Sequence, residues 1–231
     1  MANIKISIED NIFNTHLNLI NKNGLTFDNN RITINYYCIE RSASTVIAEN
    51  LSKIININRL RHENWEVANM ATYRDFRDVA VSIWRKLHYT ENFEYMEIEH
   101  IIKYAEDAKY EAKHLTDIFD KKIKPVFFAK YEDYYKDFSI FLNAFLNFFD
   151  LELSSEVYDI ILNGFDFDAA KKRYNSNVPI YTIGQTSNRG TGYHHIDTGE
   201  VGKWKKWIRE KDWCIINTIL KEYLEYWGYE L

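Results

Sequence analysis

Apolar positions along the chain follow two patterns, short continuous runs typical of buried strands and a spacing of three or four residues typical of helices. Continuous runs at 32–39, 67–73 and 125–131 predict three strands. A stretch with helical spacing follows each of them, at 46–57, after Asp75 and at 135–149. Strands that alternate with helices favour an α/β fold with a mainly parallel central sheet flanked by helices.

The rest of the chain adds further helices and one long loop. Helical spacing predicts a long helix or helix pair at 93–122, a helix at 154–162, and a last helix at 213–227. Residues 183–204 hold five of the eight glycines and predict a functional loop. No internal repeat or low-complexity linker divides the 231 residues, so we expect a single domain over residues 1–231.

Composition and charge exclude several classes of protein. A formal net charge of −5 argues against a dedicated nucleic-acid-binding protein, which carries a strongly basic face. The first ten residues lack the apolar core of a secretory signal, and no window is long and apolar enough to span a bilayer, so we expect a cytoplasmic protein with no membrane partner. Cys38 and Cys214 favour small buried side chains over a disulfide. No cluster has the spacing of metal ligands, so we expect no metal.

The turn at 41–45, Arg-Ser-Ala-Ser-Thr, joins the first predicted strand to the first predicted helix. A strand that leads through a tight turn into a helix directs backbone N–H groups and the positive helix end at one point, which suits phosphate or sulfate. The turn lacks the glycine pair and the terminal Lys-Ser or Lys-Thr of a Walker A loop. Taken alone, it is also compatible with an ordinary structural turn.

A second turn of the same kind, at 73–82, follows the second predicted strand. Asp75 is placed to cap the helix that comes after it. Right-handed crossovers in a parallel sheet bring both turns to the carboxyl edge of the sheet. Two anion sites at one edge predict a ligand with two separated phosphates.

Segments of the chain resemble the motifs of a known family, the P-loop sulfotransferases, which take a sulfuryl group from 3′-phosphoadenosine 5′-phosphosulfate (PAPS). Residues 40–45 resemble the family's Pro-Lys/Arg-Ser-Gly-Thr/Ser-Thr, with Glu40 in place of Pro and Ala43 in place of Gly. Residues 74–82 resemble Arg-Asp-Pro-Arg-Asp-Val-Ala-Val-Ser and match it at every position except Phe76.

Two further segments resemble family motifs in the same order along the chain. Residues 131–133 resemble the family's Tyr-Glu-Asp segment, and residues 199–205 resemble its Gly-x-x-Gly-x-Trp-Lys. Asp197 and Thr198 stand where the family has Arg-Lys before the first glycine. The candidates for the missing positive charge are Arg189, His194, His195 and Lys203.

The resemblance implies a three-layer P-loop-type fold, with PAPS as co-substrate and PAP as product. It implies that the backbone from Ser42 through Ala43 and Ser44 to Thr45, with the hydroxyls of Ser44 and Thr45, holds the 5′-phosphate. Arg41 would bind there as well and act in catalysis. A fixed cation beside the bond that breaks stabilises negative charge on the departing phosphate oxygen.

For the other end of the nucleotide, the resemblance implies that Arg74 and Ser82 hold the 3′-phosphate. The arginine would do so through a charge-assisted fork and the serine through its hydroxyl. Tyr131 would lie against the adenine, and Thr198 with Gly199 would close over the 3′-phosphate.

An acceptor hydroxyl must lose its proton as its oxygen attacks sulfur, which requires a general base. His62 follows an extended segment at 57–61, where many members of the family place a catalytic histidine. A surface histidine in a polar turn is the competing interpretation, and Glu63 is the alternative base. The sequence identifies neither the acceptor, a small molecule or a carbohydrate, nor the oligomeric state.

The sequence therefore favours a PAPS-dependent sulfotransferase. Two other hypotheses stay open, a kinase-like or other nucleotide-binding P-loop protein and a non-catalytic relative that binds PAP. The missing Walker lysine argues against a kinase. Ala43, at a turn position that requires positive φ, and Asp197, an acidic residue near a phosphate, favour the non-catalytic relative.

Overall fold

The computed structural model describes residues 4–6, 26–28, 31–39, 43–60, 62–88, 93–122, 124–165 and 199–231. The strands are β1 (Ile4–Ile6), β2 (Thr26–Asp28), β3 (Arg31–Cys38), β4 (Asn56–Arg59), β5 (Met70–Tyr73), β6 (Phe127–Lys130) and β7 (Leu151–Leu153). The α-helices are α2 (Ser44–Leu51), α3 (Phe76–Leu87), α4 (Ile98–Lys121), α5 (Tyr131–Tyr134), α6 (Phe138–Phe149), α7 (Ser155–Gly164), α9 (Trp204–Trp207) and α10 (Trp213–Tyr226). The 3₁₀ helices are η2 (His62–Val67) and η3 (Glu210–Asp212).

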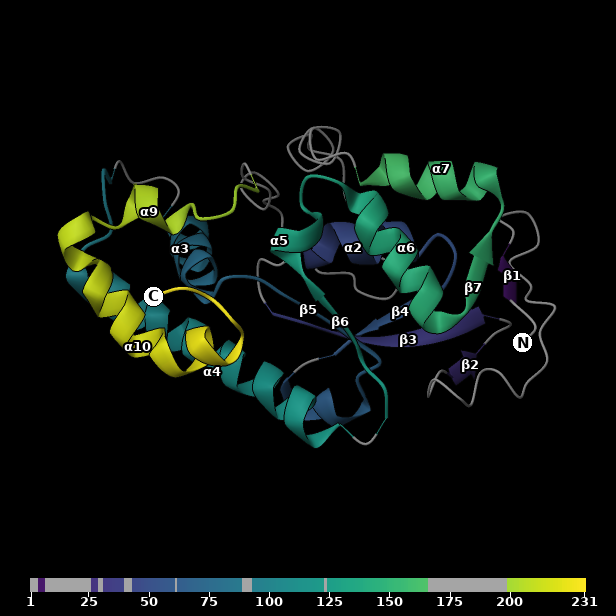
Figure 1. Ribbon diagram of the computed structural model, residues 1–231, viewed down its shortest axis with the longest axis horizontal. Helices are drawn as coiled ribbons and strands as arrows, with labels where there is room; N and C mark the ends of the chain where they lie inside the picture. The colour runs from purple at the N-terminus through teal and green to yellow at the C-terminus, as the bar shows by residue number, and fades with distance from the viewer. Residues whose placement is uncertain are drawn as a thin grey trace.

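A parallel sheet in the order β4-β3-β5-β6 forms the centre of the fold (Figure 1). β2 pairs with β3 in the antiparallel sense, and β1 pairs with β7 in a separate parallel sheet. Successive residues of a strand point to opposite faces. Ile34 and Tyr36 of β3 therefore enter the core on one face, and Tyr37 enters the core on the other. The predicted α/β fold with a mainly parallel sheet is confirmed.

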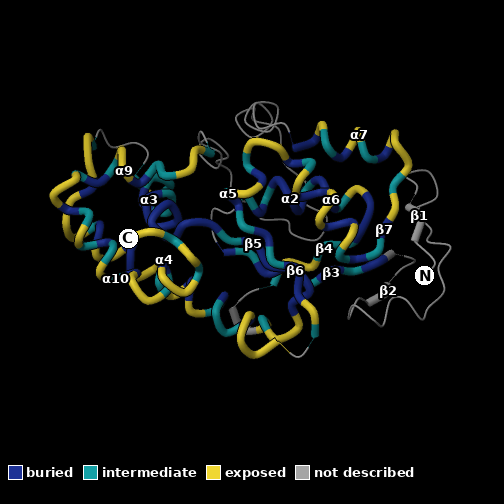
Figure 2. The backbone as a smooth tube through the Cα atoms, in the orientation of Figure 1, coloured by how far each residue is buried: buried dark blue, intermediate teal, exposed yellow. Residues whose placement is uncertain are grey.

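Helices cover both faces of this sheet and give the fold three layers. α2, α6 and α7 pack on one face, and α3, α4 and α10 pack on the other (Figure 1). Buried positions run through the sheet and the inner sides of these helices, and exposed positions lie along α4, α7 and α10 (Figure 2). The loops at the edge of the sheet are therefore positioned by the buried strands from which they leave.

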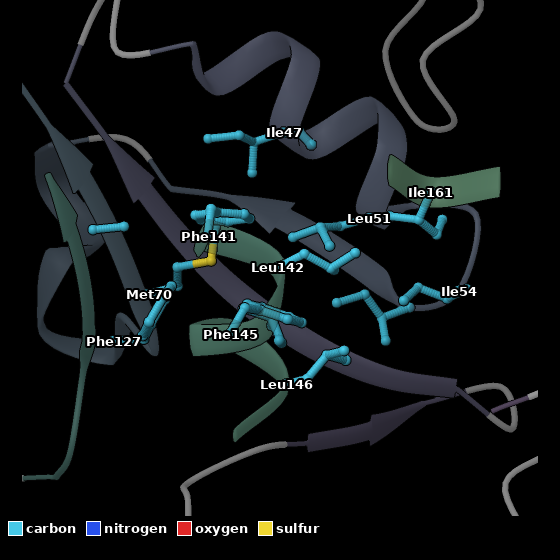
Figure 3. Packing of buried hydrophobic residues seen from close by; sticks show 14 of the residues in the cluster. Ile47, Leu51, Ile54, Met70, Phe127, Phe141, Leu142, Phe145, Leu146 and Ile161 are labelled. Carbon is cyan, nitrogen blue, oxygen red and sulfur yellow. The ribbon is translucent and has the colours of Figure 1, made fainter. Parts of the chain in front are cut away.

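An aromatic stripe on α6 makes the core of one face. Phe141, Leu142 and Phe145 of α6 lie against Met70 and Phe127 of the sheet (Figure 3). The ring centroids of Phe127 are 5.8 Å from Phe141 and 5.9 Å from Phe145. Burial of one such side chain stabilises the fold by about 2 kcal/mol, so the stripe anchors α6 to the strands that carry the site.

Some boundaries differ from those predicted. The first helix ends at Leu51 rather than at 57, because residues 56–59 leave the helix and pair with β3 as strand β4. In that pairing Ile57 lies opposite Ile34, and the apolar side chain counted toward a helix face belongs to a strand. Residues 98–121 form one continuous helix of 24 residues, α4.

The cysteine prediction was only partly right. Both thiols are free, so no disulfide joins them. Cys38 is half-buried at the end of β3, whereas Cys214 is exposed on α10, and its predicted burial was wrong. The apolar side of α10 packs through Ile216, Leu220 and Leu224, and Cys214 lies off that side.

Candidate functional site

The two predicted anion turns leave the sheet from adjacent strands. Cys38 at the end of β3 lies opposite Thr72 of β5, and the Ile39 N–H donates to the Thr72 carbonyl at 3.4 Å. The helices that follow, α2 and α3, lie on opposite faces of the sheet. This makes the edge between β3 and β5 a topological switch point, the place where open α/β sheets bind ligands.

The first turn enters α2 through a left-handed residue. Ala43 has φ 61° and ψ 13°, a conformation that glycine adopts freely and alanine adopts at a cost of about 1 kcal/mol. Among the described residues no side chain caps the start of α2, and its first turn contains no acidic residue. The first N–H groups and the positive end of this helix therefore suit an anion.

Of the residues predicted for this turn, the structure describes Ala43, Ser44 and Thr45. Ser44 is buried and begins α2, and Thr45 is half-buried beside it. Arg41 and Ser42 lie outside the described residues. Their predicted roles therefore remain predictions.

Arg59 is a cation at this turn that the sequence analysis missed. It ends strand β4, and its Nη2 donates to the Ser44 Oγ at 3.1 Å. The Arg59 Nη2 also lies 3.6 Å from the Cys38 Sγ. The parallel pairing of β4 with β3, with Arg59 opposite Tyr36, carries this exposed guanidinium to the carboxyl edge of the sheet. Its position inside the extended segment at 57–61, three residues before His62, was the available signal.

The predicted base follows the same strand. The backbone of His62 begins η2, directly beyond the carboxyl end of β4. The side chains of His62 and Glu63 lie outside the described residues, so the choice between them remains a prediction.

The second turn is held by ion pairs. Asp75 caps α3, as predicted, by accepting a hydrogen bond from the Arg77 N–H at 2.9 Å. The Arg77 guanidinium returns to the same carboxylate at 2.7 Å and donates to the Asn217 Oδ1 at 3.0 Å. Its Cζ also lies 4.5 Å from the Trp204 ring centroid. Arg77 is thus a buried structural cation and does not face solvent.

Arg74 is the cation at the start of this turn, and its neighbours fix its position. Its Nη2 lies 2.7 Å from the Asp78 Oδ2, and both side chains are buried. The Arg74 guanidinium also lies over the Tyr131 ring, 4.8 Å from the centroid. Ser82, predicted to act with Arg74, is half-buried further along α3.

The glycine-containing segment at 199–204 closes against these residues. The Tyr131 hydroxyl donates to the Gly199 carbonyl at 2.9 Å, and the Arg74 Nη2 donates to the Glu200 carbonyl at 3.1 Å. Gly199 and Gly202 have φ 67° and 73°, which explains why glycine is needed at both positions. The structure therefore brings Arg74, Tyr131 and Gly199 together, and the roles that the resemblance implies for them remain predictions.

Glu132 supports the second turn from behind. Its Oε1 accepts a hydrogen bond from the Asp75 N–H at 2.7 Å, and its Oε2 accepts one from the Tyr229 hydroxyl at 3.1 Å. Burial raises the pKa of Glu132, and the hydrogen bond from the Asp75 backbone acts in the opposite direction. Burial likewise raises the pKa of Tyr131 to about 12, which keeps its hydroxyl a hydrogen-bond donor.

Most residues that bear on the missing positive charge before Gly199 lie outside the described residues. These are Asp197 and Thr198 and the candidates Arg189, His194 and His195. Lys203, the remaining candidate, lies at the N-terminal boundary of α9, one residue after Gly202. The part of the chain that the structure describes contains no group of three His, Cys, Asp or Glu side chains that could hold a metal ion.

A sequence model described as the sulfotransferase domain matches residues 68–228. The chain belongs to the sulfotransferase domain family. The match includes the second turn, the Tyr-Glu-Asp segment and the glycine-containing segment, and it begins after the first turn. Membership confirms the family that the motifs resembled and the sulfuryl-transfer activity predicted from it.

A crystal structure of mouse sulfotransferase SULT7A1 complexed with PAP is similar in fold to this sulfotransferase. The TM-score is 0.57, with 17% sequence identity over 87% of this chain and 94% of the mouse chain. At that identity the similarity shows the fold alone. A search of curated protein sequences finds no match. No helix in the described ranges is both long enough and apolar enough to cross a membrane.

Proposed function

We propose that this single-domain sulfotransferase binds PAPS across the switch point between β3 and β5 and transfers its sulfuryl group to a hydroxyl of a small molecule or carbohydrate. The supporting observation is that the two anion turns begin on adjacent parallel strands, while α2 and α3 diverge to opposite faces. A nucleotide with phosphates at both ends fits one such edge. A cytoplasmic location is part of the same proposal.

The 5′ end of the nucleotide belongs to the first turn. The backbone of residues 42–45 and the hydroxyls of Ser44 and Thr45 hold the 5′-phosphate at the start of α2. Arg41 and Arg59 supply positive charge there. The Arg59 guanidinium, already 3.1 Å from the Ser44 Oγ, lies where negative charge collects on the leaving phosphate.

The reaction is one displacement at sulfur. The acceptor oxygen forms a bond to sulfur, and the bond from sulfur to the bridging oxygen of the 5′-phosphate breaks with its electron pair left on PAP. The acceptor proton passes to His62, with Glu63 as the alternative base. The extended strand β4 leads directly to both residues.

The 3′ end belongs to the second turn. Arg74 and Ser82 hold the 3′-phosphate, and Thr198 with Gly199 closes over it. Tyr131 is assigned to the adenine. Its contacts with Arg74 and with the Gly199 carbonyl favour a second task, that of fixing the 3′ end of the site.

The test measures nucleotide binding and transfer on the same protein. PAP should raise the melting temperature, and labelled sulfuryl should move from PAPS to at least one member of a panel of small alcohols, phenols and sugars. Absence of any PAP-dependent shift would contradict the proposal. PAP binding with no transfer to any acceptor would instead support the non-catalytic relative.

Arg74→Ala tests the placement of the 3′-phosphate. We expect PAP affinity to fall about 100-fold, because a charge-assisted fork is lost. Arg77 is a poor control, since its buried ion pair holds α3 together. Arg209→Ala is the better one, because Arg209 pairs with Asp212 outside the site and is partly exposed. Equal losses in both variants would overturn the assignment.

A further inference from the structure

Asp78 joins the second turn to the glycine-containing segment. Its Oδ2 accepts hydrogen bonds from the Arg74 Nη2 at 2.7 Å and from the Gly202 N–H at 2.8 Å. Its Oδ1 accepts one from the Trp204 N–H at 2.9 Å. A single carboxylate thus holds an arginine four residues away and two backbone groups more than 120 residues away.

We propose that Asp78 is a positioning residue that assembles the 3′-phosphate end of the site before the nucleotide arrives. The inference rests on the proposed function, because it assigns the purpose of that assembly to the 3′-phosphate. Asp78 touches no reacting atom. It acts through Arg74 and through the segment at 199–204, which closes over the phosphate.

The segment at 199–204 is tied to the second turn at both of its ends. Its first carbonyls, at Gly199 and Glu200, accept hydrogen bonds from the Tyr131 hydroxyl and the Arg74 Nη2. Its last N–H groups, at Gly202 and Trp204, reach Asp78. A backbone held at both ends cannot move away from Arg74 without breaking buried hydrogen bonds.

The carboxylate of Asp78 also sets the orientation of Arg74. Two bonds from the Nη2, to the Asp78 Oδ2 and to the Glu200 carbonyl, fix the plane of a group whose five donors keep a rigid fork geometry. Asp78 is 2% exposed and Arg74 is 6% exposed, so water competes little for these bonds. A fork oriented in advance loses less side-chain freedom when a phosphate binds.

Asp78→Asn tests this role by comparing two nucleotides. PAP carries both phosphates, whereas adenosine 5′-phosphate engages only the first turn. We expect PAP affinity to fall about 30-fold and the affinity for adenosine 5′-phosphate to stay within about twofold. In transfer assays the KM for PAPS should rise with little change in kcat. Equal losses for the two nucleotides, or no loss of PAP affinity, would overturn the proposal.

Two further variants complete the experiment. Asp107→Asn makes the same substitution at an exposed position of α4 and should leave both affinities unchanged. The double variant Arg74→Ala with Asp78→Asn should lose less PAP affinity than the product of the two single losses, because Asp78 acts in part through that arginine. Single losses that multiply fully in the double variant would contradict this link.

Hydrogen exchange on the unaltered protein keeps the proposal testable if Asp78→Asn does not fold. The amides of Gly202 and Trp204 should be protected without nucleotide, because Asp78 already accepts their hydrogen bonds. If these two amides exchange at unprotected rates until PAP is added, the proposal that the site is assembled before the nucleotide binds is overturned. If the unaltered protein binds no PAP, the proposed function fails, and exchange still measures the arrangement by itself.

Discussion

The two turns at the edge of the sheet are built in different ways. The first, at the start of α2, consists of a left-handed alanine, a helix end with no capping side chain among the described residues, and a guanidinium from the neighbouring strand. The second, at the start of α3, is capped by Asp75 and held by ion pairs of Arg74 and Arg77. The two proposed anion sites on adjacent strands therefore differ in how much of each is fixed by side chains.

The difference in construction between the two turns suits two different tasks, binding in the second turn and catalysis in the first. In the second turn, side chains satisfy one another in advance, which suits a phosphate that is held and not changed. In the proposed arrangement of the first turn, backbone N–H groups and cations lie beside the bond that breaks, where stabilisation of charge speeds the reaction. We therefore expect substitutions in the second turn to change stability and affinity, and those in the first to change rate.

The largest effect should follow Arg77→Ala in the second turn. Loss of this guanidinium leaves the Asp75 carboxylate buried without its ion pair, which should cost about 3 to 5 kcal/mol of unfolding free energy. Urea denaturation measures the loss. Lys121→Ala removes an exposed ion pair on α4 and should cost under about 0.5 kcal/mol. A difference of less than about 1 kcal/mol between the two variants would contradict the claim that buried ion pairs hold the second turn.

Arg59→Ala tests the expectation that substitutions in the first turn change the rate of transfer. The Arg59 side chain is exposed, so the melting temperature should hold, while kcat falls about 100-fold as leaving-group stabilisation is lost. Steady-state transfer assays measure this loss. Arg59→Lys keeps the charge and should recover part of kcat. A normal kcat in Arg59→Ala would show that its guanidinium plays no part in the transfer step.

Ala43→Gly tests the backbone strain of the first turn, where the expected effect is smaller. Since Ala43 has φ 61°, glycine should raise the unfolding free energy by about 1 kcal/mol. Ala48→Gly is the matched control, because Ala48 lies inside α2 with ordinary helical geometry and glycine should destabilise there by about 1 kcal/mol. Chemical denaturation of both variants should give opposite signs, and the same sign would contradict the strain assigned to Ala43.

The smallest effect is a dependence of stability on alkaline pH that arises from Tyr131, which packs against Arg74 of the second turn. Burial raises the pKa of Tyr131 from 10.0 to about 12, so above pH 10 its hydroxyl ionises first in the unfolded chain. The stability it contributes is complete below pH 10 and is lost as pH rises toward 12. Between pH 9 and 10.5 this loss should stay below about 1 kcal/mol. Tyr131→Phe should flatten the decline, and an unchanged slope in denaturation would contradict the assignment.

The sequence predicted the parts of the site that depend on local order. The run at 32–39, the Asp75 cap and the match at 74–82 each lie within a few residues, so period and motif were sufficient. The strand predicted at 67–73 was right only in its second half, because Val67 ends η2 and β5 begins at Met70. Strands β1, β2 and β7 were missed because a strand of three residues has too few positions to show a period.

Other parts of the site depend on pairings between distant segments, which a single sequence does not show. Arg59 reaches the first turn only because β4 pairs with β3 in one register, and a shift of one residue would turn its side chain to the opposite face. Asp78 matched the motif, but its bonds to Gly202 and Trp204 span more than 120 residues. The predicted roles of Arg41, Ser42 and Thr198 concern positions outside the described residues.

Tyr229 supports the second turn from a distant part of the chain. Its hydroxyl reaches Glu132 across 97 residues, and its ring packs edge-on against Phe76, the residue in place of the family's proline. These contacts form only after residue 229 has left the ribosome. The pairing of β3 with β5 needs no residue beyond 73, so the strands that carry the two turns can pair during synthesis before the contacts of Tyr229 form.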